Sequence, residues 1–305
     1  MKRLLYLLLF IANSLWAQVP EGKKVISSLY IYDLPSKSSR LILKEKRHFE
    51  APNWSRDGKY LLINAYGLLE KVGLNGEKLG NLPTDFVQMA NNDHGYSFDG
   101  KTLFISSGKK EVKSGSSFIF KVSSEGGIPT QITPLSPSYW HGVSPDGKDI
   151  VYCAPRNENY DVYKISTSGG TEIRLTDAPG LDDGPEYSPD GKYIYFNSFR
   201  SGRMQIWRMH PDGSAPEQMT FDVYSNWFVH IAPNNKVGTI ITYLEDQEQN
   251  HPFGKQVKMR LLDLATKKIT DLTEAFYGGQ GTINVPSWSP DGKQFAYVRY
   301  ELEDL

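Results

Sequence analysis

Histidines that stand just before copies of a repeated turn are the residues best suited to chemistry in this sequence. The turn reads Ser-Pro-Asp-Gly-Lys in its clearest copy, at residues 188–192. His94 and His141 lie five residues before the aspartate of their own copies, and His230 lies four residues before the equivalent position of another. Imidazole nitrogens bind divalent metals, and a catalytic site keeps one ligand position open. The sequence predicts a metal site from these three histidines and His251, with hydrogen bonds to loop carbonyls as the alternative.

The positions seven residues before each turn aspartate, or its equivalent, are polar or aromatic throughout, unlike a protein core. They are Glu50, Asn92, Tyr139, Asp183, Trp227 and Asn284. Such side chains suit a ligand funnel that combines hydrogen-bonding groups with aromatic platforms. The candidate ligand-binding residues are Tyr139, Trp140, Asp183, Asn226, Trp227, Gln280 and Asn284. For the tyrosine and the tryptophans, packing between neighbouring sheets is the alternative, and for Asp183 it is a cap at the start of a strand.

The repeated turn organises the chain into short antiparallel strands. Proline presets φ, aspartate can bond its own backbone and glycine supplies a positive φ, so each copy predicts a tight turn between two strands. Alternating, aromatic-rich sequence at residues 186–196 and 205–209 favours strands on both sides. A second turn at residues 210–213 and a short strand ending near Thr220 complete a four-stranded unit.

Six copies of this unit are visible in the sequence. Their marker positions are Gly58, Gly100, Gly147, Gly191, Asn235 and Gly292. The copies lie roughly 40 to 60 residues apart, which is typical of propeller repeats. Asparagine can replace the glycine in one copy because it tolerates the left-handed conformation. The sequence therefore predicts an all-β, six-bladed β-propeller with four-stranded antiparallel blades.

The two ends of the chain each contribute half of one blade. Residues 28–33 and 40–43 have the pattern of a third and fourth strand, whereas residues 285–289 and 294–300 have that of a first and second strand. Pairing these halves gives a two-plus-two closure. Closure of the ring removes an open sheet edge, which would otherwise favour aggregation.

The first residues have the pattern of a secretory signal peptide. Two basic residues are followed by an apolar run at residues 4–11 and by the small residue Ala17. The run is too short to span a membrane. We expect a signal peptide at residues 1–17 and a single propeller domain at residues 18–305, in a protein that is periplasmic or secreted.

The net charge and the cysteine content limit which classes of partner and which covalent cross-links are expected. The 305-residue chain has a formal net charge of −1, which argues against a nucleic-acid surface. Its one cysteine, Cys153, excludes an intramolecular disulfide. We expect a monomer without a membrane span that binds a glycan, peptide or protein ligand.

The repeated turns resemble those of TolB-type β-propellers when they are taken together with two further segments. These are Ile-Trp-Arg-Met at residues 206–209 and Arg-Leu-Thr at residues 174–176. The resemblance covers essentially all of the chain after residue 17. It implies a propeller that binds a glycan, peptide or protein partner at its central channel.

The channel histidines also resemble, more faintly, the oligogalacturonate lyases, propellers of the same repeat that bind a divalent metal through histidines and a glutamine. That resemblance implies an alternative function as a metal-dependent polysaccharide lyase. His94 or His141 would take the proton next to a uronate carboxylate, and Arg156 or Arg200 would bind that carboxylate. The two arginines occupy equivalent repeat positions, so a structural role in contact with the neighbouring blade is the alternative.

Overall fold

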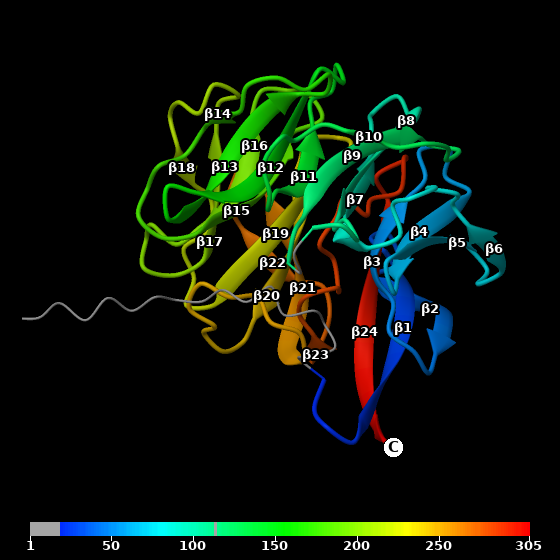
Figure 1. The fold of residues 1–305 in the computed structure, drawn as a ribbon. Coiled ribbons are helices and arrows are strands. Elements are labelled where there is room, and N and C mark those ends of the chain that lie inside the picture. Colours follow the sequence, from blue (N-terminus) through cyan, green and yellow to red (C-terminus); the bar gives the residue numbers. More distant parts are fainter. Residues whose placement is uncertain (1–18, 113–114) are drawn as a thin grey trace, which may run out of the picture.

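A computed structural model describes residues 19–112 and 115–305, so the expected signal peptide lies outside the described residues. The described chain forms six antiparallel sheets arranged as the blades of a propeller, which confirms the predicted fold. Figure 1 shows β7, β11, β15 and β19 near the middle of the molecule, with outer strands such as β14, β18 and β6 at its rim. The described part of the chain contains no helix with the length and apolarity needed to cross a bilayer.

Each of the first five blades is a meander whose first strand lies innermost. Blade one contains β3 (Glu50–Trp54), β4 (Tyr60–Ala65), β5 (Leu68–Gly73) and β6 (Lys78–Asn81). Blade two contains β7 (Ala90–Tyr96), β8 (Thr102–Ser107), β9 (Phe118–Ser123) and β10 (Thr130–Gln131). Blade three contains β11 (Tyr139–Val143), β12 (Asp149–Arg156), β13 (Asn159–Ser166) and β14 (Ile173–Arg174). Blade four contains β15 (Asp182–Tyr187), β16 (Ile194–Ser198), β17 (Gln205–Met209) and β18 (Glu217–Gln218). Blade five contains β19 (Ser225–Ile231), β20 (Val237–Tyr243), β21 (Lys255–Asp263) and β22 (Ile269–Asp271), and β23 (Phe276–Gly278) also pairs with β21.

Blade six is built from both ends of the described chain, as predicted. β1 (Lys23–Asp33) pairs antiparallel with β24 (Gln294–Asp304) over its full length and with β2 (Ser38–Glu45) on its other side. Figure 1 shows β1 and β24 lying side by side. The innermost strand expected at residues 285–289 is reduced to one bridge between Trp288 and Phe295.

Apolar residues of the second strands form the interior of the blades. Leu61, Leu103, Ile150, Ile194 and Ile240 have no exposed surface. They pack in clusters that join each blade to its neighbours. The repeated turns hold their own shape through side chains: Ser188 Oγ donates to Asp190 Oδ1 at 2.7 Å and accepts from the Tyr193 backbone N–H at 3.0 Å.

The innermost strands of the first five blades share an irregularity. The register of β3, β7, β11, β15 and β19 shifts partway along each strand. Ala51, Gly184 and Phe228 occupy the same repeat position at this irregularity, and their φ angles are 53°, 60° and 46°. A bulge adds a residue to one strand and changes the direction of the side chains around it. Strict alternation of inward and outward side chains is therefore broken beside the propeller axis.

Candidate functional site

Polar side chains from several blades meet at the propeller axis beside these bulges. We call Asp93, His141, Asp183, Phe228 and His251 the axial cluster. The first four come from the innermost strands of blades two to five, and His251 comes from the long loop between β20 and β21. All but His251 are buried, and the His251 side chain is 22% exposed. The cluster therefore reaches the surface through His251.

Asp183 is the centre of the axial cluster. Its Oδ1 lies 3.2 Å from His141 Nε2 and its Oδ2 lies 3.5 Å from His251 Nε2, while the Gly184 N–H donates to Oδ1 at 2.7 Å. Burial alone would raise the pKa of Asp183, but the hydrogen bonds and charges of both histidines outweigh it and hold the pKa well below its ordinary range. Asp183 is therefore a buried carboxylate that favours the protonated form of His141.

The pKa values of Asp93 and His141 are both raised at the axis, for different reasons. Burial raises the pKa of Asp93 to about 6, with His141 opposing the rise and Asp183 adding to it. Burial opposes the charged form of His141, but Asp93 and Asp183 outweigh it and raise the pKa of the imidazole. The site thus contains carboxyl groups with different proton affinities beside a histidine, a combination suited to binding a cation or moving a proton.

Phe228 covers the His141 imidazole from across the axis. The two rings are stacked with centroids 5.8 Å apart and planes inclined by 22°. Asn197 Oδ1 accepts the Phe228 N–H at 2.9 Å and so supports its unusual backbone conformation. A β-carbon at Gly184 would lie 2.6 Å from Asn197 Nδ2 and 3.0 Å from the Phe228 ring, so glycine is required there for close approach.

Glu50 extends the acidic side of the axis into blade one. Burial, aided by Asp93, raises the pKa of Glu50 to about 8, although a hydrogen bond from Asn64 opposes the rise. Its Oε2 has no hydrogen-bond partner and lies 3.8 Å from His48 Nε2, which also has none. Burial lowers the pKa of His48 to about 3. Both groups are therefore neutral at neutral pH and face each other without a direct bond.

Two of the four histidines of the expected metal site, His141 and His251, come together at Asp183, and the other two have different partners. His230 Nδ1 lies 2.6 Å from Glu186 Oε2 and its Nε2 lies 2.8 Å from the Ile283 carbonyl oxygen. His94 Nε2 lies 3.5 Å from the Leu62 carbonyl oxygen. Among residues 19–112 and 115–305, no group of three or more His, Cys, Asp or Glu side chains is arranged to hold a metal ion. His94 and His230 thus contact backbone carbonyl oxygens, the arrangement given above as the alternative to metal binding.

The two arginines considered for carboxylate binding are engaged within their own blades. Arg156 binds Glu172 at 3.0 Å and donates to the Pro137 carbonyl oxygen at 2.8 Å. Arg200 binds Asp182 at 2.9 Å and lies over the Trp207 ring. Their contacts are structural, as the alternative held, but the partners belong to the same blade and not to the neighbouring one.

The aromatic candidates differ in exposure. Trp140 is buried and stacks on Phe104 with ring centroids 6.0 Å apart. Trp227 has no exposed surface and packs edge-on against His251 at 4.7 Å. Tyr139 is half-buried beside the axis, and burial raises the pKa of its hydroxyl. Packing therefore accounts for both tryptophans, and Tyr139 is left as the aromatic candidate with accessible surface.

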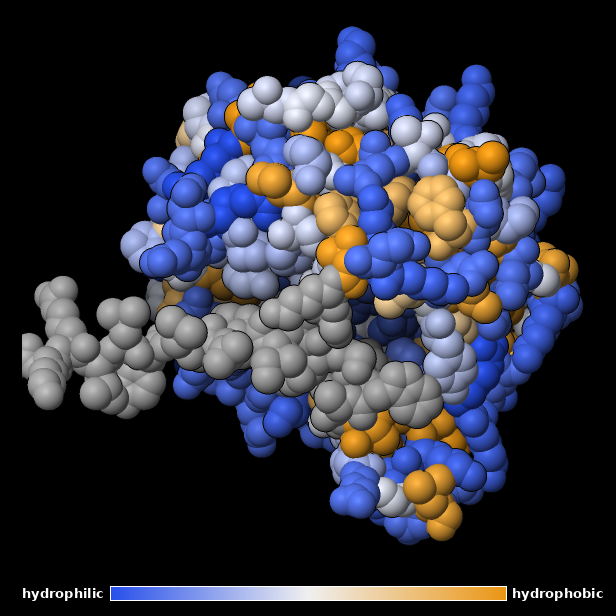
Figure 2. Space-filling model, in the orientation of Figure 1, coloured by the Kyte–Doolittle hydropathy of each residue, from blue (hydrophilic) through white to orange (hydrophobic). Residues whose placement is uncertain are grey.

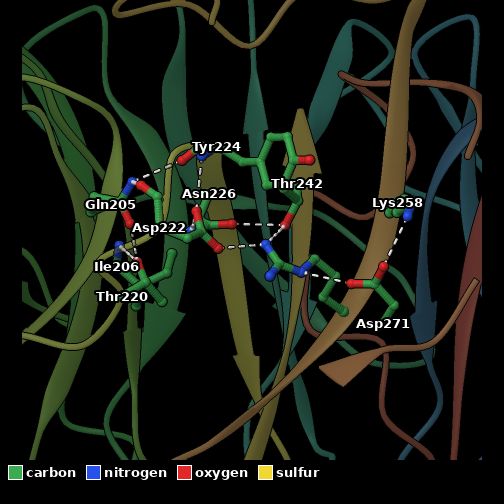
Figure 3. A network of polar contacts seen from close by, with 10 residues as sticks. Gln205, Ile206, Thr220, Asp222, Tyr224, Asn226, Thr242, Lys258 and Asp271 are labelled. Atoms are coloured by element: carbon green, nitrogen blue, oxygen red, sulfur yellow. Dashed lines mark hydrogen bonds and ion pairs between the residues drawn. The ribbon is translucent and has the colours of Figure 1, made fainter. Parts of the chain in front are cut away.

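Asn226 belongs to a polar network between blades four and five (Figure 3). Its Nδ2 donates to Gln205 Oε1 at 3.2 Å, and its Oδ1 accepts from Thr242 Oγ1 at 2.7 Å. Asp222 accepts from both Asn226, at 3.2 Å, and Arg260, at 2.6 Å. The Asn226 side chain has no exposed surface, so its contacts serve to join the two blades.

The two candidate ligand residues near the glycine-rich segment at residues 278–281, Gln280 and Asn284, differ in their exposure. Asn284 is buried, and its Oδ1 accepts the Gly281 N–H at 2.6 Å, which fixes the loop. Gln280 is half-buried, and its backbone N–H donates to the Pro252 carbonyl oxygen at 3.3 Å. This contact joins the segment to the loop that carries His251. Among the predicted ligand-binding and metal-binding residues, His251, Gln280 and Tyr139 are thus the accessible ones.

Comparisons with known proteins give one family match to part of the chain and two relatives that span most of it. A family model, the TolB beta propeller domain, matches residues 135–302. An uncharacterized protein of Agrobacterium fabrum is 44% identical over 280 residues, which are 92% of this chain and 94% of that protein. A structure from Agrobacterium tumefaciens, solved under the name TolB, has a TM-score of 0.85 at 44% identity and covers 91% of this chain and 99% of its own.

Two further likenesses are weaker. The Tol-Pal system protein TolB of Helicobacter pylori is 29% identical over 160 residues, which are 52% of this chain and 36% of that protein. An oligogalacturonate lyase solved in complex with manganese has a TM-score of 0.52 at 14% identity and covers 87% of this chain and 70% of its own. At that identity the lyase shows a shared fold alone.

Proposed function

Since the chain belongs to the TolB β-propeller family, we propose that it binds a protein partner on the face where the axial cluster lies. The supporting observation is the position of its exposed apolar side chains. Strands alternate in direction, so the loops after the second and fourth strand of every blade lie on the same face as the β20–β21 loop. Large exposed apolar residues on these loops are Tyr66, Phe86, Met89, Val112, Leu135, Phe221 and Val223.

This arrangement combines apolar contacts with a polar centre. Phe86 is 53% exposed, Phe221 is 66% exposed and Val223 is 76% exposed. Figure 2 shows that apolar residues form separate patches among hydrophilic ones on the side of the molecule in view. Apolar and aromatic anchors within a polar surrounding are typical of protein interfaces. The name of the Helicobacter relative, a protein of the Tol-Pal system, favours a protein partner over a glycan.

The partner segment that fits best carries a positive charge. Asp93, Asp183 and Glu50 place three buried carboxyl groups at the axis, and protonation of Glu50 leaves Asp183 and Asp93, whose pKa is about 6, as the negative charges at neutral pH. A lysine or arginine side chain that enters beside His251 gains from these charges, while apolar neighbours in the same segment contact the loops. We therefore expect a segment that alternates basic and apolar residues.

Capture experiments test this function. The protein is immobilised, exposed to an envelope extract of its host, and compared with the double variant Phe221→Ser, Val223→Ser. A matched control is Ile128→Ser, Ile173→Ser, whose residues are also exposed but lie in the β9–β10 connection on the other face and in the outer strand β14. The proposal requires a partner that the wild type and the control retain and the first variant loses. Equal retention by all three would place the interface elsewhere.

Export completes the proposed function. We propose that residues 1–17 direct the chain out of the cytoplasm, which supports a periplasmic or secreted location. N-terminal sequencing of protein recovered from the envelope fraction should begin at Gln18. Recovery of the uncut chain from the cytoplasm would contradict export.

Metal content distinguishes the binding function from the lyase alternative. Dialysed protein titrated with Mn²⁺ should show no rise in melting temperature. His94 and His230 contact backbone carbonyl oxygens, and the described residues contain no group of three side chains arranged to hold a metal ion. A saturable rise, together with ultraviolet absorbance from unsaturated product on addition of oligogalacturonide, would support the lyase.

A further inference from the structure

The repeated turns form a ring of contacts on the face opposite the axial cluster. Every turn glycine except Gly147 approaches a residue of the preceding blade. A β-carbon at Gly191 would lie 3.5 Å from Pro145 Cγ, and one at Gly292 would lie 3.3 Å from Pro233 Cδ. In another pair of blades the contact is a hydrogen bond of 3.3 Å from the Asp190 N–H to Asn235 Oδ1. The turns therefore seal the junctions between neighbouring blades.

This ring is interrupted between blades two and three. No described atom lies within 4 Å of the β-carbon position of Gly147. A cavity of about 250 Å³ opens at the same junction. The lining residues that matter here are Phe98, Asp99, Thr102, Phe104, Lys121 and Asp146.

Two residues of blade two create the cavity. Phe98 stands where the neighbouring turns have proline or arginine, and Arg56 of blade one lies over its ring at 5.1 Å and donates to the Ser97 carbonyl oxygen. This contact ties the turn of blade two to blade one. Thr102 stands where blades one and four have Tyr60 and Tyr193. The small side chain leaves unfilled the space that a tyrosine ring takes in those blades.

A cation already lies beside that space. Lys71 Nζ lies 4.9 Å from the centre of the Tyr60 ring, and in blade four Arg208 lies 4.3 Å from the Tyr193 ring. Lys121 occupies the equivalent position in blade two. Lys71, Lys121 and Arg208 each pair with the residue two positions after the tyrosine or threonine, which is Leu62, Phe104 and Tyr195, respectively. Lys121 Nζ donates to the Thr167 carbonyl oxygen of blade three at 2.8 Å. The cation is present but the ring that it would cover is missing.

We propose that this cavity binds a small aromatic amine. The aromatic ring takes the place of the missing tyrosine ring, between the Lys121 ammonium and the side chains of Phe98 and Phe104. An apolar cavity of about 150 Å³ is enough to hold benzene, so the volume here suffices for one ring and a short chain. The amine extends to the mouth, where the exposed carboxylate of Asp99 supplies the opposite charge, while Asp146 on the other side of the mouth is paired with Lys148 at 3.0 Å. The site is independent of the partner surface on the other face.

Calorimetric titration with tyramine tests the proposal. We expect saturable binding with a dissociation constant in the millimolar range or tighter. The saturated-ring analogue 4-(2-aminoethyl)cyclohexanol should bind several-fold more weakly, because it cannot make the cation–π contact with Lys121. Absence of saturable tyramine binding, or equal binding of both amines, would overturn the proposal.

Variants locate the bound ring. Thr102→Tyr restores the residue found in blades one and four and should abolish tyramine binding, and its melting curve shows whether it is folded. Lys121→Met should weaken binding several-fold. Lys164→Met is its matched control, because Lys164 bonds the Pro211 carbonyl oxygen at 3.1 Å in the same way one blade later, away from the cavity. Undiminished binding by folded Thr102→Tyr, or equal losses in the two methionine variants, would show that the ring binds elsewhere.

Discussion

Phe228 holds its backbone at a φ of 46° and stacks its ring on the His141 imidazole, with centroids 5.8 Å apart. A bulky residue with a positive φ is an outlier, and such conformations persist where the surrounding structure holds them in place. Here the surrounding includes Asn197, which accepts the Phe228 N–H. The residue at the same repeat position in blade four is Gly184, which has a φ of 60°.

The positive φ of Phe228 predicts that a glycine variant is more stable than an alanine variant, the reverse of the usual order in a strand. Both Phe228→Ala and Phe228→Gly remove the ring, but glycine adopts the left-handed conformation without the cost of about 1 kcal/mol that alanine bears. We expect the glycine variant to be the more stable by about that amount in urea unfolding. At the neighbouring Val229, where φ is not positive, alanine should be better than glycine. The same order at both positions would contradict the strain at Phe228.

The raised pKa of Glu50 predicts that the free energy of unfolding falls as pH rises. Its pKa is raised from 4.5 to about 8 by burial and by Asp93, so the folded protein keeps a proton that the unfolded chain releases. The stabilisation from this group is fully present below about pH 4.5 and is lost as pH approaches 8. Glu50→Gln, which is neutral at every pH, should gain roughly 2 to 3 kcal/mol over the wild type between pH 5 and pH 7.5. Parallel stability curves for the two proteins would disprove the raised pKa.

Asp183 should be the most sensitive position of the axial cluster. Asp183→Asn removes the charge that lies near both His141 and His251, and breaking a buried ion pair in this way costs about 3 kcal/mol. Asp190→Asn, at the exposed turn of the same blade, is the control and should change stability little. Equal effects at the two positions would mean that the cluster adds nothing to stability.

Removal of the N-terminal half of blade six should cause aggregation. A chain without residues 27–43 loses most of the strand that pairs with β24 and leaves an open edge. Light scattering and size-exclusion chromatography measure the outcome. Lys44→Ser is the control, since it removes an exposed salt bridge to Glu301 and keeps the strand. A truncated protein that stays soluble and unfolds cooperatively would contradict this role of the closure.

The fold was predictable because the turn chemistry repeats. A proline, aspartate and glycine at fixed offsets, each between alternating strands, identify blade after blade without reference to distant contacts. The closure followed from the same pattern, because each end of the sequence contained two strands of one unit. The innermost strand at residues 285–289 was the exception, and only the Trp288–Phe295 bridge forms there.

The axial cluster was only half predictable, and the bulges explain why. Strict alternation along a strand selects the positions five and seven residues before the turn aspartate, where His141 and Asp183 lie. It passes over the position six residues before, where Asp93 and Phe228 lie in their own blades. A register shift brings that intermediate position to the axis as well. A non-glycine residue between polar neighbours gives no signal of positive φ in sequence, whereas Gly184 at the equivalent position does.

The pairing of β1 with β24 also sets the order of events during biosynthesis. Lys23 and Asp304, which form a salt bridge at the end of this pair, are separated by 281 positions in the sequence. β1 must wait until β24 has been synthesised before the two can pair, so closure of the ring is a late step of folding. Contacts between strands so far apart in the sequence form slowly, because the entropy of bringing them together is lost before they pair.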